Sequence, residues 1–432
     1  MSAAAGSSRK HQEAGDPTGG RLLLDAVRFV HRALALAGSE SSQPPGAAPD
    51  TAPPLQLEKV RCEASMLLRA ALPVADRDPR LPAALAGLAA ALAAPSPESL
   101  TVRLCLRPGI ALDLALVHLH LRALGVGDPR LDPLLDDLLG ASRLRGPERP
   151  PHRELEQLWL HSLWSGEAEP ESFMRALSAS SLAYGFDHLA GSTDDAYAFT
   201  HAILYATDNG RRRVSLPRSA AEIARDADAI LAIALDAGNH DVAAEVLWTW
   251  PMLDLPPTLL ATQARALLVQ VSQDGGFLPG PGFDPAVHRR LALPEREAYG
   301  LRTSYHTTLV HGLFLAATLT QQEHPQPCPE GGTGDAADAV LGCLRPTTRS
   351  EAWWVRFAAL PAATRDVLAP ALVTMALRRA ADAADLAAVQ VTLCLAAEHQ
   401  VPETPVMQQA RVLLRRAMTC AELAAAAAAA GA

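Results

Sequence analysis

Residues 192–210 read Ser-Thr-Asp-Asp-Ala-Tyr-Ala-Phe-Thr-His-Ala-Ile-Leu-Tyr-Ala-Thr-Asp-Asn-Gly. Ser192 is a favourable N-cap residue for a helix, and Asp195 completes a capping box with it. Gly210 stands where a glycine commonly follows the C-terminus of a helix. Local rules thus mark both ends of this segment, and they predict a helix over residues 193–208.

Similar signals recur along the rest of the chain. Ala and Leu make up most of its 49% hydrophobic content, and both favour helices. Strand-like alternation of apolar and polar residues is scarcely present, and Pro, Gly and Asp separate the amphipathic stretches. We expect helices near residues 22–37, 56–71, 80–94, 98–105, 109–124, 131–139, 152–164, 170–183, 193–208, 219–237, 240–250, 257–272, 297–322, 350–358, 361–381, 384–399 and 404–418. The prediction is an all-α protein of repeated helical hairpins, as an α/α toroid or, alternatively, an α-solenoid.

Pro- and Gly-rich segments indicate how these helices are grouped. Gly146–Pro151 is the clearest internal boundary in the sequence. We expect a disordered leader over residues 1–20, an N-terminal helical region over 21–145 with a Pro-rich loop near 38–54, a main helical-hairpin domain over 151–420, and a frayed Ala-rich tail over 421–432.

The composition of the chain indicates which binding partners and which cellular compartment to expect. The formal net charge of −9 disfavours binding to nucleic acid or anionic lipid. Arg211–Arg213 is more typical of a solvated cluster at a helix C-terminus than of a phosphate site. No apolar run approaches the ~20 residues that cross a bilayer, and residues 1–20 lack the apolar region of a signal peptide. The six cysteines form no C-x-x-C pair, so we expect buried free thiols and a cytoplasmic protein.

A polar stripe follows the predicted helix over 193–208. Side chains of this stripe recur at steps of three or four and share one face: Asp194, Tyr197, His201, Tyr205 and Asp208. Such groups are typical of catalytic pockets and of buried polar networks, whereas solvent-facing helices carry Lys, Glu and Arg. We expect a functional cavity in which His201 works with Asp208 or Asp194, aided by Tyr205. A structural hydrogen-bond network is the alternative.

A second polar cluster lies over residues 302–312. His306 and His311 are five residues apart, about 140° around a helix, so they cannot both point at one centre. One of them is expected to join the polar stripe as a general acid or base. A satisfied core histidine is the alternative for either residue.

The spacing within the stripe disfavours a metal site. Asp194 and His201, like His201 and Asp208, are seven residues apart, on the order of 10 Å along a helix axis and too far to share an ion. A metal would need His201 together with ligands from other helices, such as His188, His306 or His311. Phosphate-binding and dinucleotide-binding motifs are absent from the sequence. We therefore expect no metal and no cofactor.

Residues 195–210 and 304–310 resemble an actinobacterial all-helical family, many of whose members lie beside natural-product genes. The family pattern has Asp-x-Tyr, Leu-Thr-His, Thr-Asp-Phe-Gly and, later, Tyr-His-Thr-Thr. Here Phe199 replaces the Leu and Asn209 replaces the Phe, which leaves a Thr-His…Thr-Asp-x-Gly signature. The resemblance implies a helical protein of specialised metabolism and singles out Tyr197, Thr200, His201, Thr207, Asp208, Tyr305 and His306.

A second resemblance is to the α/α toroids of terpene cyclases and protein prenyltransferases. Residues 270–277 are similar to their Gln…Asp-Gly-Gly-aromatic turn, in which the Gln caps a helix and the aromatic residue packs on the next hairpin. Residues 192–195 are similar to the Asp-x-Asp-Asp acid motif of class II cyclases. In that comparison Asp194 is the proton donor, and Ser192 replaces the first Asp.

These observations together predict a tailoring enzyme of bacterial specialised biosynthesis, a cyclase, lyase or transferase that works by acid–base chemistry in a helical cavity. His201, Asp208, Asp194, Tyr205 and His306 are the candidate catalytic residues. The substrate is expected to be a small molecule or a peptide, with contacts from Tyr197, Thr200, Thr207, Tyr305 and His311. The alternatives are a non-catalytic helical scaffold for a peptide or carrier protein, and an acyl or aminoacyl transferase.

Overall fold

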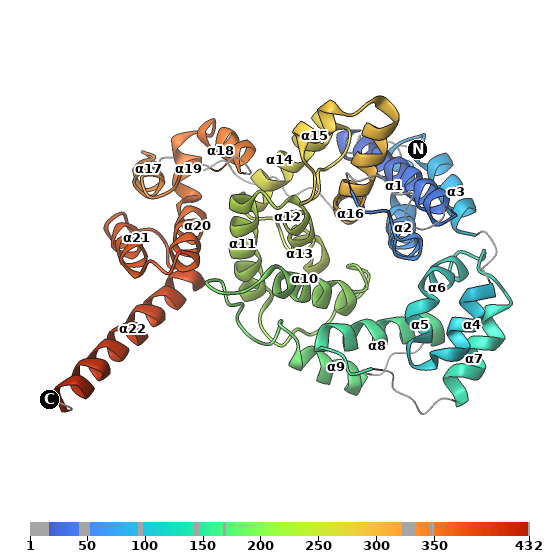
Figure 1. Ribbon diagram of the computed structural model, residues 1–432, viewed down its shortest axis with the longest axis horizontal. Coiled ribbons are helices and arrows are strands. Elements are labelled where there is room, and N and C mark those ends of the chain that lie inside the picture. The colour runs from blue at the N-terminus through green and yellow to red at the C-terminus, as the bar shows by residue number, and fades with distance from the viewer. Residues whose placement is uncertain are drawn as a thin grey trace, which may run out of the picture.

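The computed structural model describes residues 17–42, 52–93, 98–141, 147–166, 170–321, 333–345, 347 and 350–430. In these ranges the regular elements are helices and there is no strand, as Figure 1 shows. The all-α class expected from the sequence is confirmed. Of the leader expected over residues 1–20, residues 1–16 lie outside the described residues, and residues 17–20 correct the expectation because they begin helix α1. Most of the Pro-rich loop near 38–54 also lies outside the described residues, and residues 38–41 belong to α1.

Short helices and turns alternate through the first third of the chain. In order they are α1 (Pro17–Ser41), α2 (Leu57–Ala71), the 3-10 helix η1 (Leu72–Arg77), α3 (Leu81–Leu92), α4 (Glu98–Leu106), the 3-10 helix η2 (Pro108–Ile110), α5 (Ala111–Leu114), α6 (Leu116–Arg122) and α7 (Leu131–Ala141).

The middle of the chain holds the helices that build the site described below. They are α8 (Pro151–Ser165), α9 (Pro170–Ala179), α10 (Thr193–Thr207), α11 (Ala220–Ala237), α12 (His240–Val246), α13 (Thr249–Leu253), α14 (Leu259–Gly275), α15 (Pro285–Arg290) and α16 (Leu293–Leu319).

The last part consists of α17 (Asp335–Leu341), α18 (Glu351–Ala358), α19 (Ala362–Val367), α20 (Ala369–Asp382), α21 (Leu386–Glu398) and α22 (Pro405–Ala430). Helix α22 extends away from the other helices at lower left in Figure 1. It continues to Ala430 through the segment expected to fray, and Met418 and Leu423 on it are exposed.

The helix contacts close into a ring. Helix α2 packs against α6, α6 against α8, α8 against α10, α10 against α12, α12 against α16, and α16 returns to α2. Helix α1 covers the closing contact because it packs on both α2 and α16, beside which it lies in Figure 1. A closed ring brings together helices that are far apart in the sequence. A regular toroid with an inner and an outer layer of helices stays a prediction.

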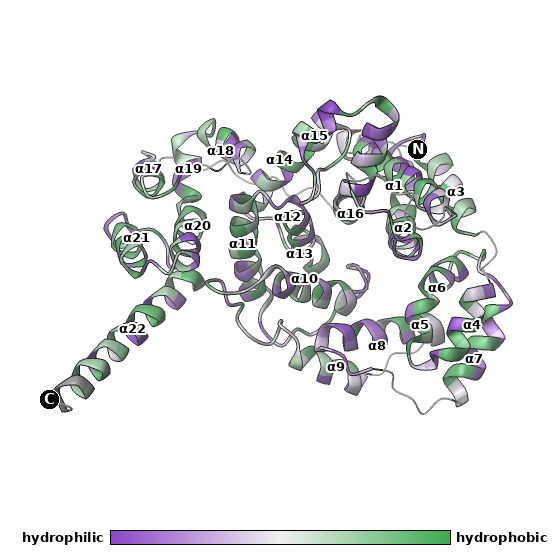
Figure 2. Cartoon of the chain, in the orientation of Figure 1, coloured by the Kyte–Doolittle hydropathy of each residue, from purple (hydrophilic) through white to green (hydrophobic). Residues whose placement is uncertain are grey.

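One hydrophobic core extends from Leu22 on α1 to Ala410 on α22, and a smaller separate core joins α4, α5 and α7. The largest fully buried side chains are Trp159, Trp250 and Trp353. Figure 2 shows hydrophobic residues along α11, α12 and α20, in the interior of the arrangement, where their burial stabilises the fold. No described helix is both long and apolar enough to cross a membrane.

Both boundaries of α10 follow the local signals to within one residue. The capping box is present, with Asp195 N donating to Ser192 Oγ at 3.2 Å and Ser192 N donating to Asp195 Oδ2 at 2.7 Å. The helix ends at Thr207, one residue before the expected end, and Asp208, Asn209 and Gly210 all have a positive φ. Asp and Asn are among the few non-glycine residues that adopt this conformation readily, and here Asp208 is also held by the contacts described below.

The turn that resembles the toroid motif has a structural role. Helix α14 ends at Gly275, Gly276 has a positive φ of 73°, and Phe277 stacks on Phe29 of α1 with ring centroids 5.2 Å apart. Three residues after Phe277, the backbone of Gly280 lies close to α16. A Cβ atom at Gly280 would be 2.2 Å from the carbonyl oxygen of Thr303. Glycine is therefore required at this contact.

The cysteines correct one expectation. Cys105, Cys343, Cys394 and Cys420 are exposed and Cys62 is half-buried, so the described thiols are free as expected but are mostly not buried. Cys328 lies outside the described residues. Cys105, Cys394 and Cys420 lie on the exposed faces of α4, α21 and α22, and Cys343 lies in the turn after α17.

Candidate functional site

Two buried carboxylates form the centre of the site. Asp241 and Glu245 are four residues apart on α12, so they share one face of the helix. Asn239 caps this short helix by accepting a hydrogen bond from Val242 N at 3.2 Å. Asp241 is 2% exposed and Glu245 is 1% exposed. A buried carboxylate is costly unless positive charge or hydrogen-bond donors surround it.

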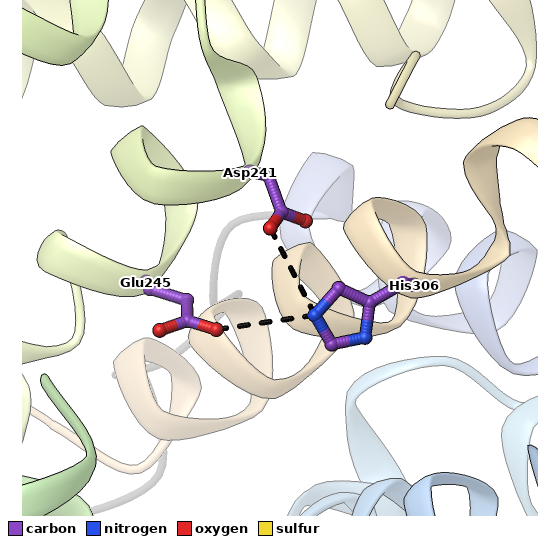
Figure 3. Close-up of side chains that lie close together, drawn as sticks. All are labelled: Asp241, Glu245 and His306. Atoms are coloured by element: carbon purple, nitrogen blue, oxygen red, sulfur yellow. Dashed lines mark ion pairs between the residues drawn. The ribbon is translucent and has the colours of Figure 1, made fainter. Parts of the chain in front are cut away.

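Two imidazoles from other helices face these carboxylates. His306 on α16 has its Nε2 atom 3.8 Å from Asp241 Oδ2 and 4.0 Å from Glu245 Oε1, and Figure 3 shows the three side chains pointing toward one another. His201 on α10 has its Nε2 atom 3.7 Å from Glu245 Oε1. The side chains of His201 and His306 are 24% and 34% exposed, so solvent reaches both rings. We call Asp241, Glu245, His201 and His306 the carboxylate–imidazole centre.

Three hydroxyl groups hold the carboxylates in place. Tyr197 Oη donates to Asp241 Oδ2 at 2.6 Å, and Thr307 Oγ1 donates to Asp241 Oδ1 at 2.7 Å. Thr200 Oγ1 donates to Glu245 Oε2 at 2.6 Å. Hydrogen bonds to an ionised acceptor are short and strong, so both carboxylates are fixed in orientation. Burial, followed by the charge of Asp241, raises the pKa of Tyr197, which keeps its proton on the phenol.

Glu63 of α2 approaches the centre from the opposite side of His306. Its Oε1 atom lies 3.2 Å from His306 Nδ1. Burial alone would lower the pKa of His306, but the carboxylates of Glu63, Asp241 and Glu245 together raise it to about 9. Burial and the charge of Glu63 likewise raise the pKa of Tyr305. The centre thus has more negative than positive side chains around it.

Several predicted residues therefore meet at the centre. Tyr197, Thr200, His201 and His306 contact Asp241, Glu245 or both, and Tyr305 lies beside Glu63. Tyr197 and His201 also stack, with ring centroids 6.1 Å apart. The two sequence segments that carry the family resemblance, 195–210 and 304–310, thus supply side chains to one place.

The other half of the polar stripe does not reach this centre. Asp194, at the start of α10, is exposed. Tyr205 is 4% exposed and donates to Glu156 Oε1 of α8 at 2.8 Å. The stripe is split because two helices supply its carboxylate partners: α12 provides Asp241 and Glu245, whereas α8 provides Glu156.

Asp208 is an anchor of the fold. Arg69 of α2 donates to both of its carboxylate oxygens, at 2.7 and 2.9 Å, and Trp159 Nε1 of α8 donates to Oδ1 at 2.6 Å. Burial would raise the pKa of Asp208, but the Arg69 guanidinium lowers it below the ordinary value. Arg212, four residues after Asp208, donates to the carbonyl oxygen of Ala206 at the end of α10, so its role is helix capping.

Thr207 and His311 also have structural surroundings. Thr207 Oγ1 donates to the carbonyl oxygen of Ile203 and accepts from Gly210 N, which closes the turn after α10. His311 is 1% exposed and lies parallel to Phe314. Burial lowers the pKa of His311 to about 3, so it is a neutral core histidine.

Asp241, Glu245 and Glu63 were not among the residues predicted from the sequence. A signal for the first two is present, because His-Asp-Val-Ala-Ala-Glu-Val (240–246) places two carboxylates on one face of an otherwise apolar helix. Lone carboxylates on an apolar face are costly, which makes such a pair a candidate for a functional role. Glu63 carries no such signal, since its helix has other charged residues and its position depends on the contact of α2 with α16.

The ring of helices and the carboxylate–imidazole centre define an all-helical protein with a polar site between α2, α10, α12 and α16. Residues 23–316 match the model of a family described as a domain of unknown function, DUF6895, and the chain belongs to that family. The match contains every residue of the centre and ends within α16, before α17–α22 begin. No curated protein and no solved structure gives a significant match.

Proposed function

We propose that this chain is an enzyme whose reaction takes place at the carboxylate–imidazole centre. The observation that carries the proposal is the pair of solvent-accessible imidazoles, His201 and His306, above the buried carboxylates Asp241 and Glu245. A purely structural network would bury and pair its members, whereas here the side chains of His201 and His306 are 24% and 34% exposed.

The residues suit acid–base chemistry. His201 is the proposed proton-transfer group, because imidazole is suited to proton transfer near neutral pH and its Nε2 atom faces Glu245 Oε1. Tyr197 is locked by Asp241 and lies against the His201 ring, so it sets the ring orientation. Asp208, Tyr205 and Asp194 are not part of this proposal.

The proposed reaction is a tailoring step of bacterial specialised biosynthesis on a small molecule or peptide, by a cyclase, lyase or transferase. The resemblance of residues 195–210 and 304–310 to a family found near natural-product genes supports this class. The convergence of both segments on one centre supports it further, since a motif is more informative when its members meet.

The test is done in the source organism, where the wild-type protein is replaced by the His201→Ala variant or by the control variant Asp194→Asn. Asp194 is exposed on the same helix, so its substitution leaves the centre intact. We expect the His201 variant to lose one product, or to accumulate its precursor, in a comparison of metabolite extracts by mass spectrometry. We expect the control to match the wild type. An unchanged metabolite profile for a His201 variant with a wild-type circular dichroism spectrum would exclude the proposal.

A non-catalytic scaffold for a peptide or carrier protein is the second candidate. This alternative is favoured by a cavity of about 960 Å³. The cavity lies between the loop before α10 and helices α11, α20, α21 and α22. Its lining includes Arg218, Arg225 and Arg416. The scaffold predicts a phenotype for an Arg416→Ala variant and none for His201→Ala, which is the reverse of the enzymatic prediction.

A further inference from the structure

We infer that Asp241, Glu245 and His306 bind one divalent transition-metal ion, with His201 beside it as a fourth ligand or as the proton-transfer group. The inference deepens the proposed function because it rests on the same centre. The metal site is tested by measuring ion binding without any substrate, so the metal site and the proposed enzymatic function can fail separately.

The charge of the centre is the first argument. Asp241 and Glu245 are almost fully buried, and within the described residues no Lys or Arg lies within 4.0 Å of either carboxylate. Their hydrogen-bond donors are the neutral hydroxyl groups of Tyr197, Thr200 and Thr307. Buried charges are normally paired or bound to metal ions. A protonated His306 supplies one positive charge to the three carboxylates Glu63, Asp241 and Glu245, and a divalent cation would supply two.

The geometry is the second argument. One ligand atom each of Asp241, Glu245 and His306 lies within 4.8 Å of the other two. The distances from His306 Nε2, 3.8 and 4.0 Å, are too long for hydrogen bonds. They are shorter than about 4.2 Å, twice the ~2.1 Å of a bond from a metal ion to nitrogen or oxygen. An ion can therefore lie between these atoms.

The surrounding hydrogen bonds are the third argument. The hydroxyl group of Thr200 donates a hydrogen bond to Glu245 Oε2. The other carboxylate oxygen, Oε1, faces both imidazoles and accepts none of the described hydrogen bonds. Glu63 lies against Nδ1 of His306, on the other side of the ring from the centre. A carboxylate that orients the second nitrogen of a histidine is the usual partner of a metal-bound imidazole. Thr200 and Glu63 are thus placed as positioning residues for two ligands.

The donor set indicates the kind of ion. It contains imidazole and carboxylate and, among the described residues, no thiolate contact with the centre. Imidazole favours zinc, iron, cobalt, nickel or copper over calcium, while carboxylates also accept manganese. Two part-exposed histidines leave a side of the ion open, which is the arrangement of a catalytic site and not of a closed structural one.

The experiment is calorimetric titration of the full chain, freed of metal with a chelator, with ZnCl₂ and separately with MnCl₂. We expect one ion per chain, a rise in the unfolding temperature, and at least ~10-fold weaker binding for Asp241→Asn and Glu245→Gln. Asp194→Asn is the matched control and is expected to bind as the wild type does. Glu63→Gln is expected to weaken binding by about 10–100-fold through the orientation of His306.

Two outcomes would overturn the inference. One is the lack of saturable binding of either ion by the folded wild type. The other is binding to Asp241→Asn and Glu245→Gln with wild-type affinity, which would place the ion elsewhere. The visible absorption of added Co²⁺ is a second measurement on the same proteins, and a His306→Ala change must alter its spectrum. If metal binding fails while His201→Ala still loses its product, the proposed enzyme stands without an ion.

Discussion

Asp208 illustrates that a conspicuous residue of a motif can serve the fold. It lies in the polar stripe of α10, yet its carboxylate is held by Arg69 and Trp159 and not by the groups of the carboxylate–imidazole centre. Its φ of 49° is one that Asp and Asn adopt more readily than other non-glycine residues. Both observations assign it to the junction of α2, α8 and α10.

Asp208→Asn is therefore expected to cost stability and to leave the chemistry intact. Asparagine keeps the backbone conformation and the acceptor for Trp159, but it leaves Arg69, whose side chain is 15% exposed, without its counter-charge. Removing one partner of such a pair should cost about 2–4 kcal/mol of unfolding free energy. Urea denaturation measures this loss. If Asp208 were catalytic instead, the folded variant would lose its product while its unfolding free energy stayed near that of the wild type.

At the scale of helices, Asp228 of α11 links its helix to the start of α14. Thr258 is the N-cap of α14, and its Oγ1 atom also donates to Asp228 Oδ1 at 2.6 Å. Burial raises the pKa of Asp228 to about 7, because the one hydrogen bond from Thr258 lowers it too little to compensate. The contact between α11 and α14 is thus made most favourably by a protonated carboxyl group.

This shift predicts how stability depends on pH. The folded state holds the Asp228 proton up to about pH 7, whereas the unfolded chain loses it near the ordinary aspartate pKa of 3.8. The free energy of unfolding should then fall as pH rises between these values, at most by ~1.4 kcal/mol per pH unit from this group. Asp228→Asn should remove that part of the slope and stabilise the protein at pH 8. Equal slopes for the variant and the wild type in denaturation series would contradict the assignment.

The elements also explain which expectations succeeded. Helix starts such as Ser192 on α10 depend on neighbours three residues away, so the sequence alone predicts them. The end of α10 was predicted to within one residue, but the contacts of Asp208 with Arg69 and Trp159, which belong to other helices, were not predicted. His306 was identified because of its motif, whereas its partner Glu63 becomes apparent only when α2 and α16 are in contact. A feature that depends on residues nearby in the sequence can therefore be predicted, whereas one that depends on contacts between distant helices cannot.

For the whole molecule, the decisive contact is the one that closes the ring between α2 and α16. Gly312 of α16 lies where these helices meet α1, and a Cβ atom at this position would be 3.0 Å from both Ala26 Cβ and Leu67 Cδ1. Ala26 and Leu67 belong to the buried core, so the neighbours have little freedom to move away. Glu63 lies one helical turn before Leu67 on α2, which couples this contact to the candidate site.

Gly312→Leu should accordingly loosen the ring. Overpacking a tight core contact costs about 1–3 kcal/mol, and the separation of α2 from α16 should also move Glu63 away from His306. Thermal and urea unfolding measure the first effect, and the affinity of the folded variant for Zn²⁺ measures the second. Gly38→Ala on α1 is the control, because a Cβ atom there meets nothing within 4 Å, and it should be neutral or stabilising by about 0.4–1 kcal/mol. A Gly312→Leu protein as stable as this control would show that α2 and α16 can separate freely, and that the ring does not hold the centre together.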